Sequence, residues 1–118
     1  MTRAELEEFI QREFNVKADY PFEHDTETGV FRHTSNKKWF AIAMHIQRKR
    51  IGLSEDGYID IFNVKCGKEI IDSMLQESGI FPAYHMNKSN WLSIALDGSA
   101  NDEIISFLLN VSFELTKK

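Results

Sequence analysis

Apolar residues recur at intervals of three and four in three stretches of the chain, which is the spacing of one face of a helix. The first stripe consists of Leu6, Phe9, Ile10 and Phe14. Directly before it, Thr2 and Glu5 form the S/T-x-x-E pattern, in which the hydroxyl and the carboxylate each accept a hydrogen bond from an otherwise free amide. We therefore predict a first helix from Arg3 to Phe14.

Two further helices are expected on the same grounds. Apolar positions predict a second helix over residues 67–76, and Gly79 provides the left-handed residue that commonly ends a helix. The last helix is expected to begin at the Ser99–Asp102 segment, which repeats the start pattern in the form S-x-x-D, and its apolar stripe continues to the end of the chain.

Four stretches combine β-branched or aromatic residues with period-two alternation, and these are predicted strands. They cover residues 30–33, 39–46, 58–64 and 91–96. In the second stretch both alternating sets are largely apolar, so one face of the sheet is expected to lie under helices while the other is partly open. The order helix, strands, helix, strand, helix favours an α+β fold, with an antiparallel β-sheet and helices packed on one face.

The bulk properties are those of an ordinary globular protein. The chain has 118 residues, of which 42% are hydrophobic and 27% charged, and this favours one domain over residues 1–118. Cys66 is the only cysteine, so no intramolecular disulfide can form and a cytoplasmic location is expected. No apolar run approaches the roughly 18–20 residues that cross a membrane. A monomer with neither cofactor nor metal is the expected state.

Charge is distributed unevenly along the chain. The net charge of −4 disfavours bulk attraction to nucleic acid, yet the segment from Phe31 to Ile51 carries +6 and the rest of the chain −10. The six cations of this strip are Arg32, Lys37, Lys38, Arg48, Lys49 and Arg50. Two interpretations are open: the charges keep an exposed hairpin edge from pairing with other chains, or they bind an anion.

The sequence contains no assembled catalytic set. The phosphate-binding, dinucleotide-binding and hydrolase fingerprints are absent. The expected hairpin register places His33 and His45 more than ~10 Å apart, too far for one metal ion. Cys66 follows Lys65 and precedes a predicted helix start, two features that lower the pKa of a thiol, although lone cysteines are commonly buried apolar side chains. We expect a non-enzymatic protein, with a Cys66-dependent redox or transfer enzyme as the alternative.

The segment Pro82–Trp91 concentrates aromatic and polar side chains between a helix end and a strand. In one interpretation it binds a small ligand or another protein through Tyr84, His85, Asn87, Lys88 and Trp91. In the other, Asn87 caps a short turn and Trp91 begins a core strand. The residue types alone leave both interpretations open.

Several motifs of this chain occur together in one protein family. They are His85-Met86-Asn87-Lys88-Ser89-Asn90-Trp91, then Leu96-Asp97-Gly98-Ser99, and upstream Asn63-Val64-Lys65-Cys66 and Trp39-Phe40-Ala41. With these motifs the chain resembles the MmcQ/YjbR family of small bacterial proteins, and the resemblance covers residues 3–116. One departure is Gly67-Lys68, where the family often has Asp-Pro, so the second helix is expected to start differently.

The resemblance implies a fold like that of CyaY, the bacterial frataxin homologue, in which helices flank an antiparallel sheet. It also implies a double-wing motif, in which hairpin wings meet DNA. Together with the cationic strip, this makes weak DNA binding the predicted function and a small-ligand or protein-interaction module the alternative. The predicted phosphate contacts are Arg32, Lys37, Lys38, Arg48, Lys49, Arg50, Lys65 and Lys88.

Overall fold

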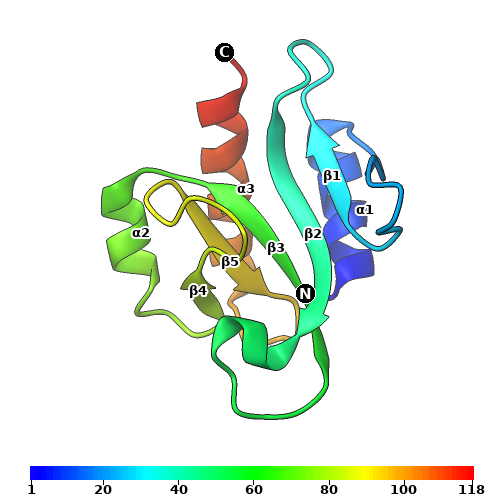
Figure 1. Cartoon of the computed structure of the whole chain (residues 1–118). Coiled ribbons are helices and arrows are strands. Elements are labelled where there is room, and N and C mark those ends of the chain that lie inside the picture. Colours follow the sequence, from blue (N-terminus) through cyan, green and yellow to red (C-terminus); the bar gives the residue numbers. More distant parts are fainter.

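The computed structural model describes all 118 residues as three α-helices, one 3-10 helix and five strands (Figure 1). In chain order these are α1 (Arg3–Phe14), β1 (Gly29–Arg32), β2 (Trp39–Gln47), the 3-10 helix η1 (Arg48–Ile51), β3 (Tyr58–Lys65), α2 (Lys68–Met74), β4 (Ile80–Pro82), β5 (Trp91–Ala95) and α3 (Asp102–Thr116). The N-terminal ammonium group lies at the start of α3, 3.1 Å from Asp102 Oδ1.

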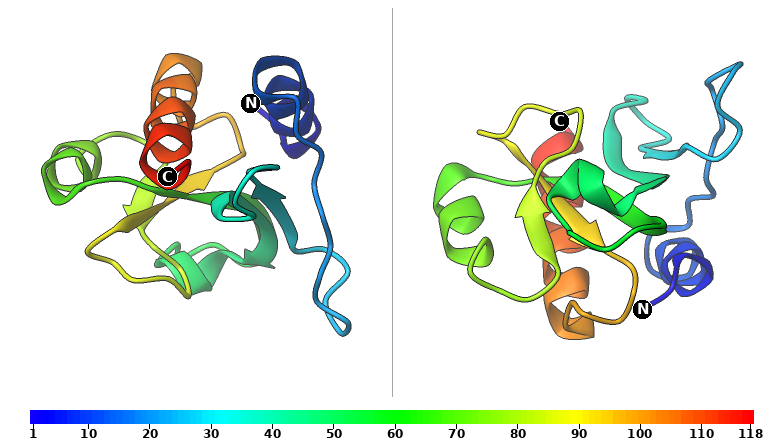
Figure 2. Two further views of the ribbon diagram at one scale, coloured as in Figure 1. Left: turned by 90° about the horizontal axis from the view of Figure 1, so that it is seen from above. Right: turned by 60° about the horizontal axis from the view of Figure 1, so that its bottom comes forward.

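The strands form one sheet in the order β1-β2-β3-β5-β4, and every neighbouring pair is antiparallel. α1 and α3 lie side by side on one face of this sheet (Figure 2). α2 contributes its buried Ile71 to the same core. The predicted α+β fold, with an antiparallel sheet covered by helices on one face, is confirmed.

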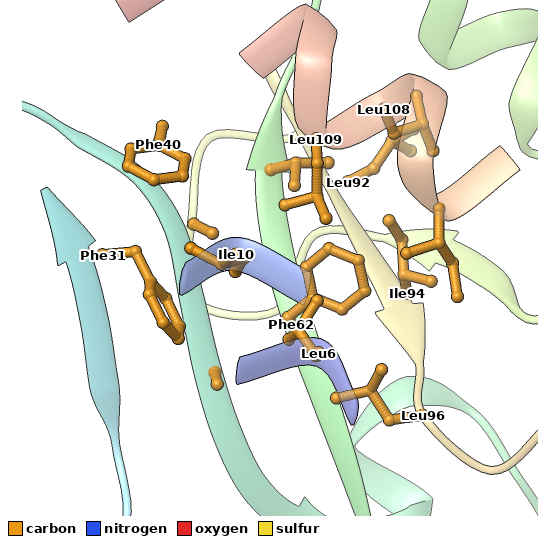
Figure 3. Close-up of a cluster of buried hydrophobic side chains, with 14 of the residues drawn as sticks. Leu6, Ile10, Phe31, Phe40, Phe62, Leu92, Ile94, Leu96, Leu108 and Leu109 are labelled. Carbon is orange, nitrogen blue, oxygen red and sulfur yellow. The ribbon is translucent and has the colours of Figure 1, made fainter. Parts of the chain in front are cut away.

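The larger core lies between this face and the helices. Phe62 of β3 packs there with Leu6 and Ile10 of α1 and with Leu108 and Leu109 of α3 (Figure 3). All five side chains are fully buried. Removal of a side chain of this size from water stabilises the fold by roughly 1.5–3 kcal/mol, so this face of the sheet holds α1 and α3 in place.

One polar residue of α3 enters the helix–sheet interface. The buried Ser112 hydroxyl donates to the Phe40 carbonyl at 2.6 Å and accepts from the Lys65 N–H at 2.9 Å. It bridges β2 and β3 where their direct pairing ends, beyond Ala41 and Val64. Since a buried backbone group needs a partner, the Ser112 hydroxyl replaces the hydrogen bonds that the neighbouring strand would otherwise provide at this point.

The turn between β1 and β2 is fastened to the end of α3. The Thr116 hydroxyl donates to the Ser112 carbonyl at 2.7 Å, so it accepts from His33 Nε2, 2.8 Å away. Burial lowers the pKa of His33, which keeps its imidazole neutral at pH 7. Asn36 Nδ2 also donates to the Thr116 carbonyl at 3.0 Å. The hairpin turn is therefore fixed against the last turn of a distant helix.

Most of the predicted element boundaries agree with the structure. α1 has the predicted bounds, and each predicted strand is present to within one residue at either end. β4 and η1 have too few residues to show a periodic pattern, and the sequence does not predict them. α2 spans Lys68–Met74 rather than 67–76, because the chain tightens into a turn in which the Glu77 N–H donates to the Met74 carbonyl at 2.9 Å.

The last helix begins at Asp102, inside the predicted Ser99–Asp102 segment, but Ser99 is not its cap. Its N-cap is Asn101, whose Oδ1 accepts from the N–H groups of Glu103 and Ile104 at 2.7 and 3.3 Å. Ser99 instead donates to Asp97 Oδ1 at 2.5 Å within the preceding turn. The side-chain amide of Asn101 lies nearer to the free N–H groups and caps the helix, whereas the Ser99 hydroxyl is already hydrogen-bonded to Asp97.

We predict that Gly79→Ala lowers the free energy of unfolding by roughly 3 kcal/mol. Gly79 has φ +79°, and an added Cβ would lie 2.7 Å from the Ala100 nitrogen. Gly52→Ala is the control, because Gly52 also has positive φ but has open space around it; its cost should be about 1 kcal/mol. Urea unfolding measures both, and equal costs would show that the contact with Ala100 has no effect.

Candidate functional site

The second face of the sheet has no α-helix over it. Ile42 and Met44 of β2 point to this side, because Ala41 and Ala43 face the helices. Two loops cover part of it instead, the first loop (residues 20–28) and the second loop (residues 83–90). Figure 2 shows both on the side of the sheet opposite α1 and α3. We call this side the open face.

A cavity of about 680 Å³ lies between the two loops. It is lined by Pro21, Phe22, Glu23, His24, Asp25 and Thr28 of the first loop, by Trp39, Ile42 and Met44 of β2, and by Tyr84, His85 and Met86 of the second loop. Its volume falls within the range of about 300–1,000 Å³ that is typical of small-molecule sites. Three segments that are distant in the sequence thus form one concave surface.

Aromatic rings form two walls of this cavity. Phe22 meets Trp39 edge to face, with ring centroids 6.0 Å apart and an interplanar angle of 87°. Tyr84 and His85 stack with centroids 4.1 Å apart and an angle of 30°. Such rings offer flat apolar faces and polar edges to a ligand.

The first loop is shaped by Asp25. The Thr28 hydroxyl donates to Asp25 Oδ2, and the N–H groups of Glu27 and Thr28 donate to Oδ1 at 3.0 Å each. These hydrogen bonds hold the pKa of Asp25 below its ordinary value, so the carboxylate stays ionised. The hydrogen bond from the Thr28 hydroxyl has the largest effect. Arg3 of α1 donates to the Glu27 carbonyl and fastens the loop to the helix layer.

The second loop is held by two buried polar side chains of the sheet. The Ser93 hydroxyl accepts from the Tyr84 N–H at 2.8 Å and donates to Asn63 Oδ1 at 2.5 Å. Asn63 Nδ2 then donates to the Tyr84 carbonyl at 2.9 Å. Asn63 and Ser93 are 0% exposed and lie opposite each other on β3 and β5. We call this closed ring of hydrogen bonds the Asn63–Ser93 clamp.

Beyond the clamp, the second loop reverses direction. His85 has φ +57°, in the left-handed region that residues other than glycine seldom adopt. Asn87 then closes a turn, since its Oδ1 accepts from the Ser89 N–H at 2.8 Å and its carbonyl from the N–H groups of Asn90 and Trp91 at 3.1 and 3.0 Å. The predicted turn cap at Asn87 is confirmed.

Only part of the predicted ligand site gathers at the cavity. Tyr84 and His85 line it, whereas Asn87, Lys88 and Trp91 do not. Asn87 is engaged in its turn, Lys88 is exposed, and Trp91 begins β5. The residues that the sequence singles out therefore divide between the cavity wall and the support of the loop.

The other half of the cavity comes from residues that the sequence does not point to. Phe22 and His24 lie in a loop without periodicity, and nothing local connects them with Tyr84. One usable signal is the presence of Asn63 and Ser93 among buried apolar residues of their strands, because a polar group buried in a sheet must find a partner. That partner is the second loop.

The cations predicted to bind DNA do not form one strip. Lys37 and Lys38 lie in the β1–β2 turn, whereas Arg48, Lys49 and Arg50 lie in η1 at the other end of β2 (Figure 1). β2 has nine residues and spans about 26 Å at ~3.3 Å per residue, and the two groups lie beyond its opposite ends. They form two separate positive ends.

The remaining predicted phosphate contacts lie near the β1–β2 turn. Lys65 pairs with Trp91 at the end of β3 that adjoins the start of β2, and Lys88 lies in the second loop just before β5. Arg32 is in an ion pair with Asp19 at 2.9 Å. Lys88 therefore does not connect the two positive ends, and Arg32 is partly neutralised.

The thiol of Cys66 is not activated. The side chain is buried in the larger core, and burial raises its pKa to about 11. Of the two interpretations of Cys66 from the sequence, the buried apolar side chain is confirmed, and the loss of hydration outweighs the neighbouring groups that would lower the pKa of the thiol. The thiolate is the reactive form of a cysteine, and at neutral pH the buried Cys66 thiol is protonated.

The rest of the structure adds little chemistry. No helix is both long and apolar enough to cross a membrane. No three histidine, cysteine, aspartate or glutamate side chains are placed to hold one metal ion. His45 Nδ1 and Asp60 Oδ1 lie 2.8 Å apart, and the His45 ring stacks on Tyr58 at 5.1 Å, but this pair lies outside the cavity.

The fold and the site define a class of small α+β protein, with helices on one face of a sheet and a loop-lined cavity on the other. A family model described as YjbR matches residues 14–115. The protein YyaQ of Bacillus subtilis (strain 168) is 38% identical over 117 residues, which cover 99% of each chain. This chain therefore belongs to the YjbR family, and the resemblance seen in the sequence motifs is confirmed.

Solved structures show the same fold. A crystal structure of a protein from Pseudomonas syringae has a TM-score of 0.96 at 36% identity and covers 99% of this chain and 100% of that chain. The Deinococcus radiodurans protein DR2400 has a TM-score of 0.70 at 26% identity, over 97% of this chain and 77% of that chain. The fold is thus shared well beyond close relatives.

We predict that Ser93→Ala lowers the free energy of unfolding by roughly 2–4 kcal/mol, because it leaves the Tyr84 N–H and Asn63 Oδ1 buried without partners. Hydrogen exchange of the Tyr84 amide should become much faster. Ser99→Ala is the control, since it removes a hydroxyl hydrogen bond at an exposed site. If the Tyr84 amide exchanges at the same rate in both variants, the clamp does not hold the loop.

Proposed function

We propose that this protein is a non-enzymatic binding protein that takes a small organic ligand into the cavity on its open face. The observation that carries the proposal is the cavity itself, about 680 Å³ in volume, between the first and second loops. Its apolar floor of Ile42 and Met44 would bury the body of a ligand, and the surrounding rings would stack on it.

The fastening of both loops supports this proposal. The first loop is fixed by Asp25 and by Arg3 of α1, and the second by the Asn63–Ser93 clamp. A site whose walls are already ordered loses less conformational freedom when a ligand binds, so more of the contact energy appears as affinity. The left-handed His85 fits the same view, because unfavourable backbone conformations cluster at binding sites.

We predict that indole, a neutral aromatic probe, shifts the backbone amide signals of the cavity residues in a two-dimensional NMR titration. Trp39→Ala should weaken the binding about tenfold or more, because it removes one aromatic wall. Phe107→Ala is the control, since Phe107 is 48% exposed on α3 and lies outside the cavity. Shifts scattered over the surface, or equal affinities in the two variants, would contradict the proposal.

DNA binding is the second candidate function, and the family resemblance and two exposed positive ends favour it. Lys37 lies in the β1–β2 turn, whereas Lys49 and Arg50 lie in η1, at the other end of β2. These three side chains are exposed and form no ion pair. Two such positive ends, one beyond each end of β2, which is about 26 Å long, would act as two wings that meet the phosphates of one duplex.

We predict for this second candidate that the affinity for a 20-base-pair duplex falls steeply between ~50 and ~200 mM salt, because phosphate contacts release counterions. Lys37→Glu with Arg50→Glu should abolish binding in a fluorescence anisotropy titration. Arg12→Glu with Lys68→Glu is the matched control, with the same change in net charge on the helices. If both double variants lose the same amount of DNA affinity, binding depends only on the net charge of the protein and the second candidate function is contradicted.

A further inference from the structure

The ionised side chains around the cavity are of one sign. Glu23 and Asp25 belong to its lining, and no lysine or arginine does. Arg32 lies 5.8 Å from the centroid of the Trp39 ring, but its charge is balanced by Asp19 at 2.9 Å. The cavity therefore presents a negative potential to a ligand that enters it.

The two carboxylates differ in what they can offer. The oxygens of Asp25 accept three hydrogen bonds within the first loop. Glu23 is exposed and forms no ion pair with the protein. Glu23 is thus the carboxylate that can meet a charged group of the ligand without first breaking a contact.

The aromatic walls favour the same sign of charge. The face of an aromatic ring carries negative electron density, so it attracts a cation placed within about 6 Å of its centroid. The rings of Trp39 and Tyr84 both line the cavity, although Arg32 already lies over the Trp39 ring. The carboxylate and the rings therefore add their effects on one ligand instead of opposing each other.

We propose that the ligand of this cavity is an organic cation, with an apolar or aromatic body over Ile42 and Met44 and a positively charged amine near Glu23. This inference rests on the proposed ligand-binding function. It disfavours nucleotides and organic acids as ligands, because their phosphate or carboxylate groups would meet two like charges at the cavity.

The test compares three probes that share one ring system: tryptamine as the cation, indole as the neutral molecule and indole-3-acetate as the anion. NMR titrations at pH 7.5 would follow the amides of the cavity residues. Tryptamine should bind about tenfold more tightly than indole-3-acetate, with indole between them. Glu23→Gln should reduce this ratio to about twofold, because it removes the carboxylate that is free to meet the amine.

Glu27→Gln is the matched control, since Glu27 is an acidic residue of the same loop that does not line the cavity. It should leave the ratio unchanged. If indole binds, and tryptamine and indole-3-acetate bind with equal affinities, the cation proposal is overturned and the proposed function stands. A ratio unaffected by Glu23→Gln would also overturn it. Failure of all three probes to shift the cavity amides would overturn the proposed function itself.

Discussion

The sheet of this protein carries apolar side chains on both faces, whereas α1 and α3 cover only one of them. On the covered face, Phe62 and its neighbours bury fully against the helices. On the open face, Ile42 is only 3% exposed although no α-helix lies over it. Loops must provide that cover, and loops bring backbone N–H and C=O groups that need partners once they leave water. The architecture of the open face follows from this requirement.

Buried side-chain hydrogen bonds fix the backbone at three places, two on the covered face and one on the open face. Ser112 replaces a rung of the ladder between β2 and β3, and His33 with Thr116 ties a hairpin turn to α3. The Asn63–Ser93 clamp provides both a donor and an acceptor for the backbone of Tyr84. A buried polar group costs free energy unless it is paired, so each of these contacts specifies one arrangement among the many that apolar packing alone would allow. The cavity depends on the clamp in particular, because the clamp sets the position of the second loop over the sheet.

The distribution of charge in space differs from its distribution along the chain. The cations between Phe31 and Ile51 appear as one strip in the sequence, but an extended strand separates neighbours by about 3.3 Å per residue and carries them to opposite ends of the molecule. Arg32 is drawn into an ion pair with Asp19. Conversely, Glu23 and Asp25 gain importance because the fold places them at a cavity without a cationic lining residue. The balance between nucleic-acid binding and small-ligand binding therefore shifts toward the ligand.

The sequence by itself determined the longer helices and strands and the fold class, because helix stripes, strand alternation and the capping box at Thr2 and Glu5 depend on neighbours within a few residues. It also determined the family, since the motif from His85 to Trp91 is contiguous. Only the tertiary structure decided the cavity and the pKa of Cys66. The walls of the cavity come from three distant segments, and the thiol is governed by burial more than by its neighbours in the chain. Such properties depend on which distant segments come into contact in the fold, and local sequence patterns do not specify those contacts.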